Sequence, residues 1–379
     1  MQTSRYFSDK IILTFSVCVV LSFLCQIFKF TAPVDIVYVI TLLLVMFCYI
    51  LSGYASVITV AITLLIFFAS FINGFVYNKM DYYTHVLITL CIFICIEVSA
   101  NVKISINTFK KIASMFFVTS IILLIAYYFG PLKTTYFDYG IGSISLNFLN
   151  PNAAGLWLTC IFILVMYSSF LFKGIKRIMY IGVALGILPI VLATQSRNSF
   201  FACVFFVVGL IATKIFNIKR VPKFILLIIA TLPLIVFVFY MFVVVGNMDY
   251  WEGIFAIDSI DKGIGTRRSI WQNVIDNFGH CFWFGDYYKY YNSQMHNSLL
   301  TIFCRFGAPV TVLACVSIYR ALKNLQENSS FYAALSLGAI FFTGCFEASV
   351  FVGIAGMYLM LLLIPACASV ENVGVEKHT

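Results

Sequence analysis

The feature that most constrains this fold is a series of long apolar runs that fills almost the whole chain. Of its 379 residues, 62% are hydrophobic and only 10% are charged. About twelve runs reach the roughly 17–25 residues that a helix needs to cross a bilayer. They lie near residues 11–28, 34–51, 55–73, 84–100, 112–130, 152–172, 178–195, 199–216, 222–245, 297–319, 329–346 and 348–369. The sequence therefore predicts a single all-α membrane domain, 1–379, a polytopic bundle of about twelve transmembrane helices.

Lysines and arginines predict how this bundle is oriented. The net charge is +9, but the cations are scattered in short loops between apolar runs. That pattern is typical of topology control and not of a nucleic-acid surface. With a cytoplasmic N-terminus, fifteen of the 24 lysines and arginines fall on the cytoplasmic side and eight on the other. The positive-inside rule then predicts that both termini are cytoplasmic.

One extramembrane segment is large, the external loop 246–295. It carries four cations and six acidic residues, so any anion site within it is local. Residues 266–278 follow a helical pattern with Trp271 in the apolar stripe, which predicts a short amphipathic helix on the membrane surface. Arg268 borders this stripe, whereas Arg267 falls near its centre and fits only if it turns inward to a ligand or if the helix begins after it.

The cysteines predict neither disulfides nor a metal centre. Eleven of the twelve fall inside or at the ends of apolar runs, where small packing residues are common. No cysteine and histidine spacing resembles a metal site. We expect no metal and no cofactor.

Three short polar motifs open helices that run inward from the external side. They are Asn150-Pro151-Asn152, Ser196-Arg197-Asn198-Ser199 and His296-Asn297-Ser298. A helix N-terminus presents unpaired N–H groups and the positive end of its dipole, and an added arginine gives bidentate contacts to phosphate. Ordinary capping also explains Asn, Ser and Pro at such positions, and an interfacial histidine bound to water or a carbonyl also explains His296. Capping does not explain Arg197, for which contact with lipid headgroups is the alternative.

Arg305 is predicted to lie inside the hydrocarbon, about 13 Å along the helix from His296 and on its opposite face. A buried guanidinium needs an acidic partner or a wet cavity. Glu347 and Glu97 are the candidate partners. A structural ion pair and a functional role both remain open for Arg305.

The chemistry that fits these residues is transfer from a lipid diphosphate. External arginines stabilise the negative charge that develops on a diphosphate leaving group, without a divalent metal. A histidine is suited to accept the proton of an attacking hydroxyl. A soluble nucleotide sugar is not normally available outside the cytoplasmic membrane, so we expect a lipid-linked glycan as donor.

The order of these motifs resembles the bacterial O-antigen polymerase and O-antigen ligase superfamily. The resemblance covers roughly 150–310 and rests on NPNAAGLWL, TQSRNSFF, GTRRSIWQNVIDNFGHCFWFGD and MHNSLLTIFCRFG. Members show a Ser-Arg at the outer start of a helix, an Arg and Trp in a large periplasmic loop, and a His-Asn-x-x-Leu before a Gly. Polymerases also show an Arg followed eleven residues later by Gly, as in Arg268 to Gly279. Arg197 departs from that spacing by one residue, and the usual Gly-x-Gly appears only as Gly285-Asp286-Tyr287.

The resemblance implies a metal-independent membrane glycosyltransferase of surface polysaccharide (lipopolysaccharide) biosynthesis. It acts in the bacterial inner membrane on undecaprenyl-diphosphate-linked oligosaccharide, and a chain-length regulator and a flippase of the same pathway are further partners. The matching positions give His296, Arg268 and Arg197 catalytic roles. Arg267, Asn152, Asn198, Asn297, Trp271 and Arg305 are the predicted substrate-binding residues.

Three functions remain open at this point. We favour a polymerase that joins repeat units, because of the compact loop, the Arg-to-Gly match and the Phe-, Ile- and Tyr-rich composition. A ligase that moves the finished chain onto the lipid A core is the first alternative. A flippase or other transporter is the second, although only Glu97 and Glu347 lie as acids inside spans and no repeat relates the halves.

Overall fold

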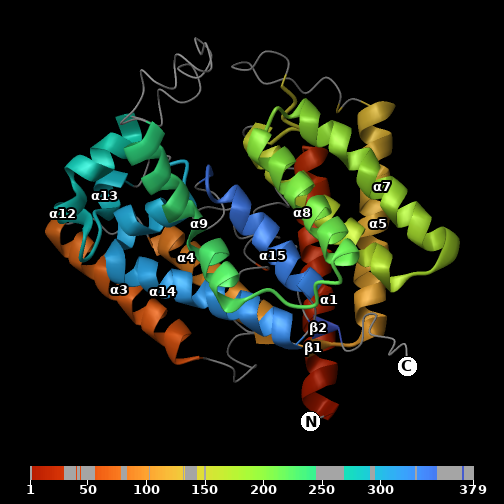
Figure 1. Cartoon of the computed structure of the whole chain (residues 1–379), viewed down its shortest axis with the longest axis horizontal. Helices are drawn as coiled ribbons and strands as arrows, with labels where there is room; N and C mark the ends of the chain where they lie inside the picture. Colours follow the sequence, from red (N-terminus) through yellow and green to blue (C-terminus); the bar gives the residue numbers. More distant parts are fainter. Residues whose placement is uncertain are drawn as a thin grey trace.

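The computed structural model describes residues 2–29, 40, 43, 56–77, 83–101, 103–130, 132, 143–148, 151–244, 269–290, 295–328, 331–347 and 369–370. These residues are almost entirely helical (Figure 1). The elements are α1 (Gln2–Ile27), α3 (Val57–Tyr77), α4 (Tyr83–Asn101), β1 (Lys103–Ile104), α5 (Ile106–Tyr128), α6 (Pro151–Ser168), η2 (Ser169–Leu171), α7 (Gly174–Ala193), α8 (Arg197–Ile215), α9 (Lys223–Phe239), η3 (Tyr240–Val244), α12 (Phe278–Cys281), α13 (Tyr287–Tyr290), α14 (Ser298–Asn328), α15 (Phe331–Thr343) and β2 (Ser369–Val370).

The predicted class of all-α membrane protein is confirmed in its coarse form. Among the described residues, eight helices are long and apolar enough to cross a membrane: α1, α3, α5, α6, α7, α8, α9 and α14. Each overlaps one predicted span, and α4 overlaps a further one. The predicted spans 34–51 and 348–369 fall almost wholly outside the described residues, so the total of twelve stays a prediction. These eight helices indicate a multi-pass membrane protein.

The predicted span 329–346 is shorter in the structure. It forms α15, which has 13 residues and ends at Thr343. Three successive turns follow, in which Gly344, Cys345 and Phe346 donate backbone hydrogen bonds to the carbonyls three residues earlier. The helix ends there because these turns pack against the start of α14, where the Ser298 N–H donates to the Gly344 carbonyl at 2.8 Å.

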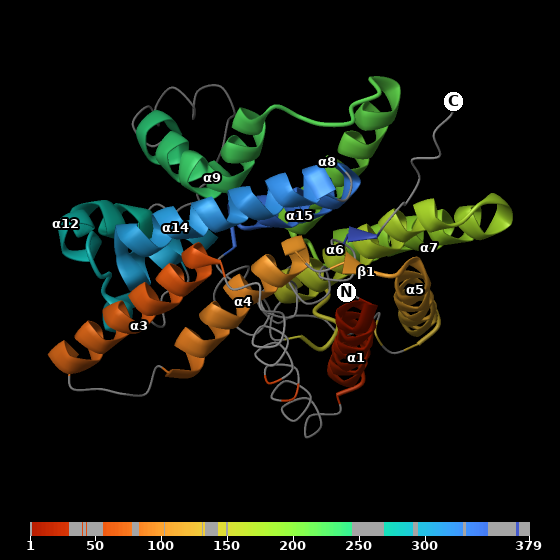
Figure 2. The ribbon, with the colours of Figure 1, turned by 90° about the horizontal axis from the view of Figure 1, so that it is seen from below.

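Two helices form the centre of the molecule, α6 and α14. α6 is apolar on every side, and all of its residues from Ala154 to Ser168 are buried, as expected of a helix enclosed by others. It packs against α5, α7 and α8, while α14 packs against α3, α4 and α9. α15 contacts α6, α8, α9 and α14 and so joins the two groups (Figures 1 and 2).

The outward faces of the helices carry large apolar side chains. Phe71 of α3, Ile175 of α7 and Phe224 of α9 are more than half exposed. Such a surface is costly in water but is solvated by lipid chains. The outer faces therefore agree with a bilayer as the solvent of this bundle.

Three segments far apart in the sequence meet at the end of the bundle where α1 begins (Figure 1). β1 and β2 pair in parallel, with Lys103 opposite Ser369. The Asp9 carboxylate accepts a 2.8 Å hydrogen bond from the Ser105 N–H at the start of α5. The two strands therefore lie on the same side of the bundle as the beginning of α1, as the predicted topology requires.

The other end of α1 is held by the segment before α6. Asn147 donates to the Ile27 carbonyl at 2.6 Å and its own carbonyl accepts from the Gln26 side chain at 2.7 Å. The Ile144 N–H donates to the carbonyl of Ala193 at the end of α7. Residues 144–147 thus connect the end of α1 to the end of α7. α6 begins a few residues after Asn147, and α8 begins a few residues after Ala193.

Candidate functional site

All three polar motifs stand at the start of a helix, as predicted. α6 begins at Pro151, α8 at Arg197 and α14 at Ser298. Asn152 lies half-buried in the first turn of α6, while Asn150 lies outside the described residues. At the start of α14, however, the Ser298 and Leu300 N–H groups donate to the Gly344 carbonyl and to the Asn297 side chain, so this helix start is capped within the protein.

The first turns of α6 and α8 are in direct contact because Gly155 lets α6 approach α8. A Cβ atom placed on Gly155 would lie 2.5 Å from the Ser196 Cβ and 2.7 Å from the Ser199 hydroxyl. One turn further, the Thr159 hydroxyl contacts the Ser199 carbonyl at 3.1 Å. Small residues and hydroxyl groups commonly mediate such close helix contacts in membranes. Sequence reasoning missed Gly155, although the small residues Ala153, Ala154 and Gly155 in its motif were a visible signal.

The close α6–α8 contact positions Arg197 on the surface. Ser196 and Ser199 are buried against α6 and their hydroxyls share a 2.8 Å hydrogen bond. Arg197, one residue further round the helix, is exposed, and Asn198 is half-buried. Gln195 takes a left-handed backbone conformation with φ of 55°, which turns the chain sharply from α7 into α8.

An open pocket of about 360 Å³ lies at this turn. Its polar wall is formed by Gln195, Ser196 and Arg197, and its apolar wall by Val191, Leu192, Phe200 and Phe201. A guanidinium and the first turn of α8 therefore border a cavity that is mostly apolar. Such a combination suits an anionic group attached to a lipid chain.

The third motif lies at the junction of α9, α14 and α15. The Asn297 side chain is fully buried and donates to the carbonyls of Pro233 in α9 at 2.7 Å and Cys345 after α15 at 3.2 Å. Its Oδ1 accepts from the Leu300 N–H at 3.0 Å and so caps α14. The Ser298 hydroxyl donates a short hydrogen bond to the Glu347 carbonyl. These contacts fix the start of α14, and a contact of Asn297 with substrate stays a prediction.

His296 precedes this buried cap and is itself half-buried. Its backbone is left-handed, with φ of 49°, an uncommon conformation for a residue with a side chain. The fixed position of Asn297 on one side and of Met295 on the other holds His296 in that conformation. The backbone of His296 thus lies between two residues that are held by hydrogen bonds to other elements.

Trp271 supplies the second anchor of that turn. Its Nε1 donates to the Met295 carbonyl at 2.6 Å, and its ring packs edge-on against Phe237 and Tyr240. The predicted amphipathic pattern is confirmed at residues 269–276, where Trp271 and Val274 are buried and Asp276 is exposed. The apolar stripe packs on the end of α9 and not on a membrane surface as predicted, and Trp271 contacts Met295, the residue before His296. Its predicted contact with substrate remains untested.

α14 is broken nine residues after Ser298, which the sequence analysis did not predict. Gly307 has φ of 87° and ψ of 176°, outside the helical range. In an unbroken helix the Cys304 carbonyl would accept from the Ala308 N–H. Here Cys304 accepts from the Asp286 N–H at 2.7 Å, and Ala308 donates to the Phe282 carbonyl at 2.7 Å. We name residues 282–286 the inserted segment. Its two hydrogen bonds to Cys304 and Ala308 replace the one that these two residues would form with each other in an unbroken helix.

Asp286 of the inserted segment forms a histidine–carboxylate pair with His280 of α12, which sequence reasoning also missed. The Asp286 carboxylate is nearly fully buried and lies 3.0 Å from Nε2 of His280, whose side chain is exposed. The other carboxylate oxygen accepts from the Lys289 N–H at 3.1 Å and caps α13. Asn73 of α3 donates to the Phe284 carbonyl at 3.1 Å. No spacing rule relates these residues, because α3, α12 and α14 meet only in the folded chain.

Arg305 lies beside this break and not in the middle of a straight helix. Its backbone would be 2.3 Å from a Cβ placed on Gly285. Arg305 and its two predicted partners, Glu97 and Glu347, are all buried, with exposed fractions of 7%, 7% and 8%. Glu97 lies on α4, which packs against α14. The predicted burial of these charges is confirmed.

The predicted site residues therefore form two groups. Asn152, Arg197 and Asn198 lie at the α6–α8 contact, and His296, Asn297 and Trp271 lie at the α9–α14–α15 junction. α15 contacts both α8 and α14 and is the element that connects the groups. Arg267 and Arg268 lie outside the described residues, which resume at Ser269.

The chain was compared with protein-family models, with curated proteins and with solved structures. None of the three comparisons found a match.

Proposed function

We propose that this chain is a membrane glycosyltransferase, an O-antigen polymerase that joins undecaprenyl-diphosphate-linked oligosaccharide repeat units. It acts on the periplasmic face of the bacterial inner membrane, with both termini in the cytoplasm. One observation carries the proposal: Arg197 is exposed at the start of α8 beside an open pocket with apolar walls. A diphosphate on an isoprenoid chain has this combination of charge and apolar surface.

In the proposed reaction, a sugar hydroxyl of one lipid-linked repeat unit attacks the anomeric carbon of the donor glycan. The bond between that carbon and the diphosphate oxygen breaks, and undecaprenyl diphosphate leaves with the bonding electron pair. Arg197 and Arg268 stabilise the negative charge on the leaving group. His296 accepts the hydroxyl proton, a role supported by its fixed turn between Met295 and Asn297.

One observation favours a second candidate, a transporter. α14 is broken at Gly307 and α15 ends in turns against the start of α14. Arg305, Glu97 and Glu347 are buried near these elements. Broken helices and buried charges inside a membrane bundle are common features of transporters.

A gene deletion followed by a gel of the cell-surface glycolipid tests the proposal. A polymerase deletion leaves the core plus one repeat unit. Bare core would indicate a ligase, and lipid-linked repeats trapped in the cytoplasm would indicate a flippase. Either of these two outcomes overturns the polymerase proposal.

The proposed orientation has its own test. A reporter that is active only in the periplasm is fused after Ser259 or after Lys173. We expect activity only after Ser259. Activity only after Lys173 would invert the proposed topology.

A further inference from the structure

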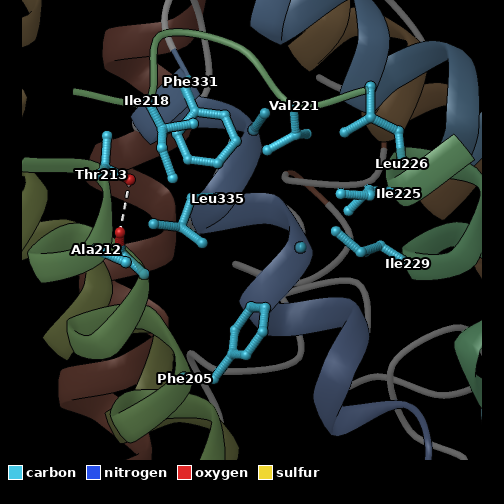
Figure 3. Close-up of a pocket in the computed structure, with 13 residues that line it drawn as sticks. Phe205, Ala212, Thr213, Ile218, Val221, Ile225, Leu226, Ile229, Phe331 and Leu335 are labelled. Carbon is cyan, nitrogen blue, oxygen red and sulfur yellow. Dashed lines mark hydrogen bonds between the residues drawn. The ribbon is translucent and has the colours of Figure 1, made fainter. Parts of the chain in front are cut away.

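A second pocket lies at the end of α8 opposite Arg197. Its volume is about 190 Å³, and its walls come from α8, α9, α15 and the linker between α8 and α9. In Figure 3, α15 forms the back of the pocket, with Leu335 at its centre, and Ile218 and Val221 of the linker lie near its upper rim. Thr213 and Arg197 are about 24 Å apart along α8 at the rise of an α-helix. The pocket is thus separate from the proposed polymerase site.

The lining of this pocket is almost entirely hydrocarbon. Phe205, Ile225, Ile229, Phe331 and Leu335 contribute apolar side chains. The one lining hydroxyl, that of Thr213, donates to the Gly209 carbonyl of its own helix at 2.6 Å, as Figure 3 shows. An apolar cavity of roughly 150 Å³ stays dry and accepts a small hydrocarbon. The pocket therefore suits a stretch of an acyl chain and not a polar ligand.

The pocket is preformed, because its rim is held by the end of α14. The Gln326 side chain binds both backbone groups of Val221, accepting from its N–H at 2.9 Å and donating to its carbonyl at 3.0 Å. Gly338 leaves space at the back of the pocket, where a Cβ would make only an ordinary contact with Ile229 at 3.5 Å. These contacts hold the rim of the cavity in place.

From the end of α8 to the start of α9, lysines and arginines are interspersed in the sequence with the residues that line the pocket. Lys214, Lys219, Arg220 and Lys223 are all exposed, and each is within two residues of a residue that lines the pocket. The described part of the chain contains no ion pair to any of the four. Between residues 209 and 230 there is no acidic residue. Four exposed cations thus lie next in sequence to the residues that line the cavity, and Glu327, beside Gln326, is the one acidic residue described on the α14 part of this rim.

We propose that this pocket binds an anionic phospholipid of the surrounding membrane. One acyl chain lies between α8, α9 and α15, and the phosphate headgroup lies against Lys219 and Arg220. Charge complementarity selects the occupant, because basic clusters at the membrane surface attract anionic lipids. The lipid connects α8 and α9 to α15 where these helices diverge around the cavity. The site is independent of the proposed glycosyltransferase activity.

Lipid retention by the full-length protein tests this proposal. The protein is purified and exchanged into micelles that contain equal amounts of phosphatidylglycerol and phosphatidylethanolamine with identical acyl chains. Native mass spectrometry then counts the lipids that remain bound. We expect the wild-type protein to retain phosphatidylglycerol preferentially. Retention without a headgroup preference, or no retention, overturns the proposal.

Two variants separate the cavity from the charge. Gly338→Leu fills the back of the pocket, so we expect the loss of one bound lipid. The double variant Lys219→Gln/Arg220→Gln keeps the cavity, so we expect it to lower the preference for phosphatidylglycerol about 10-fold. The matched control Lys173→Gln/Lys176→Gln removes two exposed cations at the start of α7 and should leave the preference unchanged.

The outcomes that contradict the proposal are distinct. If Gly338→Leu retains as many lipids as the wild type, the occupant of the pocket is not a lipid chain. If the control pair lowers the preference as much as the rim pair, the charge effect is not local. Thermal unfolding shows whether Gly338→Leu is folded. If Gly338→Leu does not fold, the double variant Lys219→Gln/Arg220→Gln decides alone: an unchanged preference for phosphatidylglycerol rejects the site.

Discussion

The Asp286 N–H donates a 2.7 Å hydrogen bond to the carbonyl of Cys304, the residue whose helical partner is displaced by the break in α14. Pro309 has no N–H, so the Arg305 carbonyl cannot receive the usual helical bond from that position. The inserted segment therefore lies where α14 cannot complete its own ladder. Unsatisfied backbone groups are costly inside a membrane bundle, which explains why the loop enters it.

Gly285→Ala and Gly307→Ala should each destabilise the protein. Gly285 has φ of 69°, and an added Cβ would be 2.3 Å from the Arg305 backbone. At Gly307 the added Cβ would be 2.4 Å from the Trp283 carbonyl oxygen. Strain and lost packing at such positions cost about 2–4 kcal/mol, measured by unfolding in detergent. Gly279→Ala is the control, since nothing lies within 4 Å of its Cβ, and equal losses for all three variants would contradict this account.

Gly155→Val should separate α6 from α8 and disturb Arg197. The added side chain would overlap Ser196 and Ser199, because even a Cβ placed on Gly155 would lie less than 3 Å from both residues. We expect loss of chain extension together with a lower unfolding temperature. Gly182→Val in α7 is the control, because its Cβ position is open. Full activity of Gly155→Val would show that the α6–α8 contact does not position the site.

Arg197→Ala, Arg268→Ala and His296→Ala should each lower polysaccharide chain extension by more than about 100-fold. Arg197→Lys and Arg268→Lys should also be impaired, because a point charge does not reproduce the bidentate guanidinium. The measurement is the glycolipid ladder on a gel, with the amount of inserted protein determined in parallel. Arg177→Ala is the control, an exposed arginine in the first turn of α7. Normal long-chain product from all three alanine variants would reject the site assignment.

Asn297→Ala should destabilise the protein by about 2–3 kcal/mol. The substitution removes two donors to the buried carbonyls of Pro233 and Cys345 and the cap of α14, and unsatisfied buried groups each cost on the order of 1–3 kcal/mol. Asn297→Asp should lose as much, because a carboxylate cannot donate to either carbonyl. Asn198→Ala, at a half-buried position in α8, is the control with a smaller expected loss. A stability of Asn297→Ala equal to the wild type would show that these bonds are not important.

Cys281 should react slowly with maleimide across neutral and mildly alkaline pH. Burial raises the pKa of its thiol, because burial disfavours the charged thiolate. At a given pH, a thiol with a raised pKa has a smaller thiolate fraction than an exposed thiol, whose pKa is about 8.5. The labelling rate of Cys281 should therefore begin to rise only at a higher pH. Peptide mapping after timed labelling measures the rate. Gly285→Ala, which disturbs the inserted segment, should increase it, and rapid labelling of the wild type near pH 7.5 would contradict the burial of Cys281.

Several elements of the fold could be predicted from short stretches of sequence. The helices α5 to α9 follow from apolar runs, and the starts of α6, α8 and α14 follow from cap residues. The stripe of Trp271 and Val274 was also visible as a helical period. These signals are local, since each depends on residues within one or two helical turns.

The sequence could not predict where α15 ends or that α14 is broken, because both features depend on segments that are distant in the sequence. Gly307 and Pro309 mark a weak point in the helix, but their sequence does not say what replaces the lost hydrogen bonds. The answer is the inserted segment, and Gly285 and Gly307 together allow the close backbone approach. His280 and Asp286 were also missed, because a helical or strand period does not bring residues six apart in sequence together.

The sequence predicted that Arg197 lies at the start of a helix, and the structure places it, exposed, as the first residue of α8. By itself, the sequence determined the bilayer as solvent, most of the helices and the polar motifs at their starts, because hydropathy and capping act over short distances. Only the tertiary structure decided that Gly155 joins two of these motifs, that α15 connects them to the third, and that a loop completes α14. Those contacts depend on steric fit and on backbone hydrogen bonds between distant segments, which no local pattern of side chains encodes.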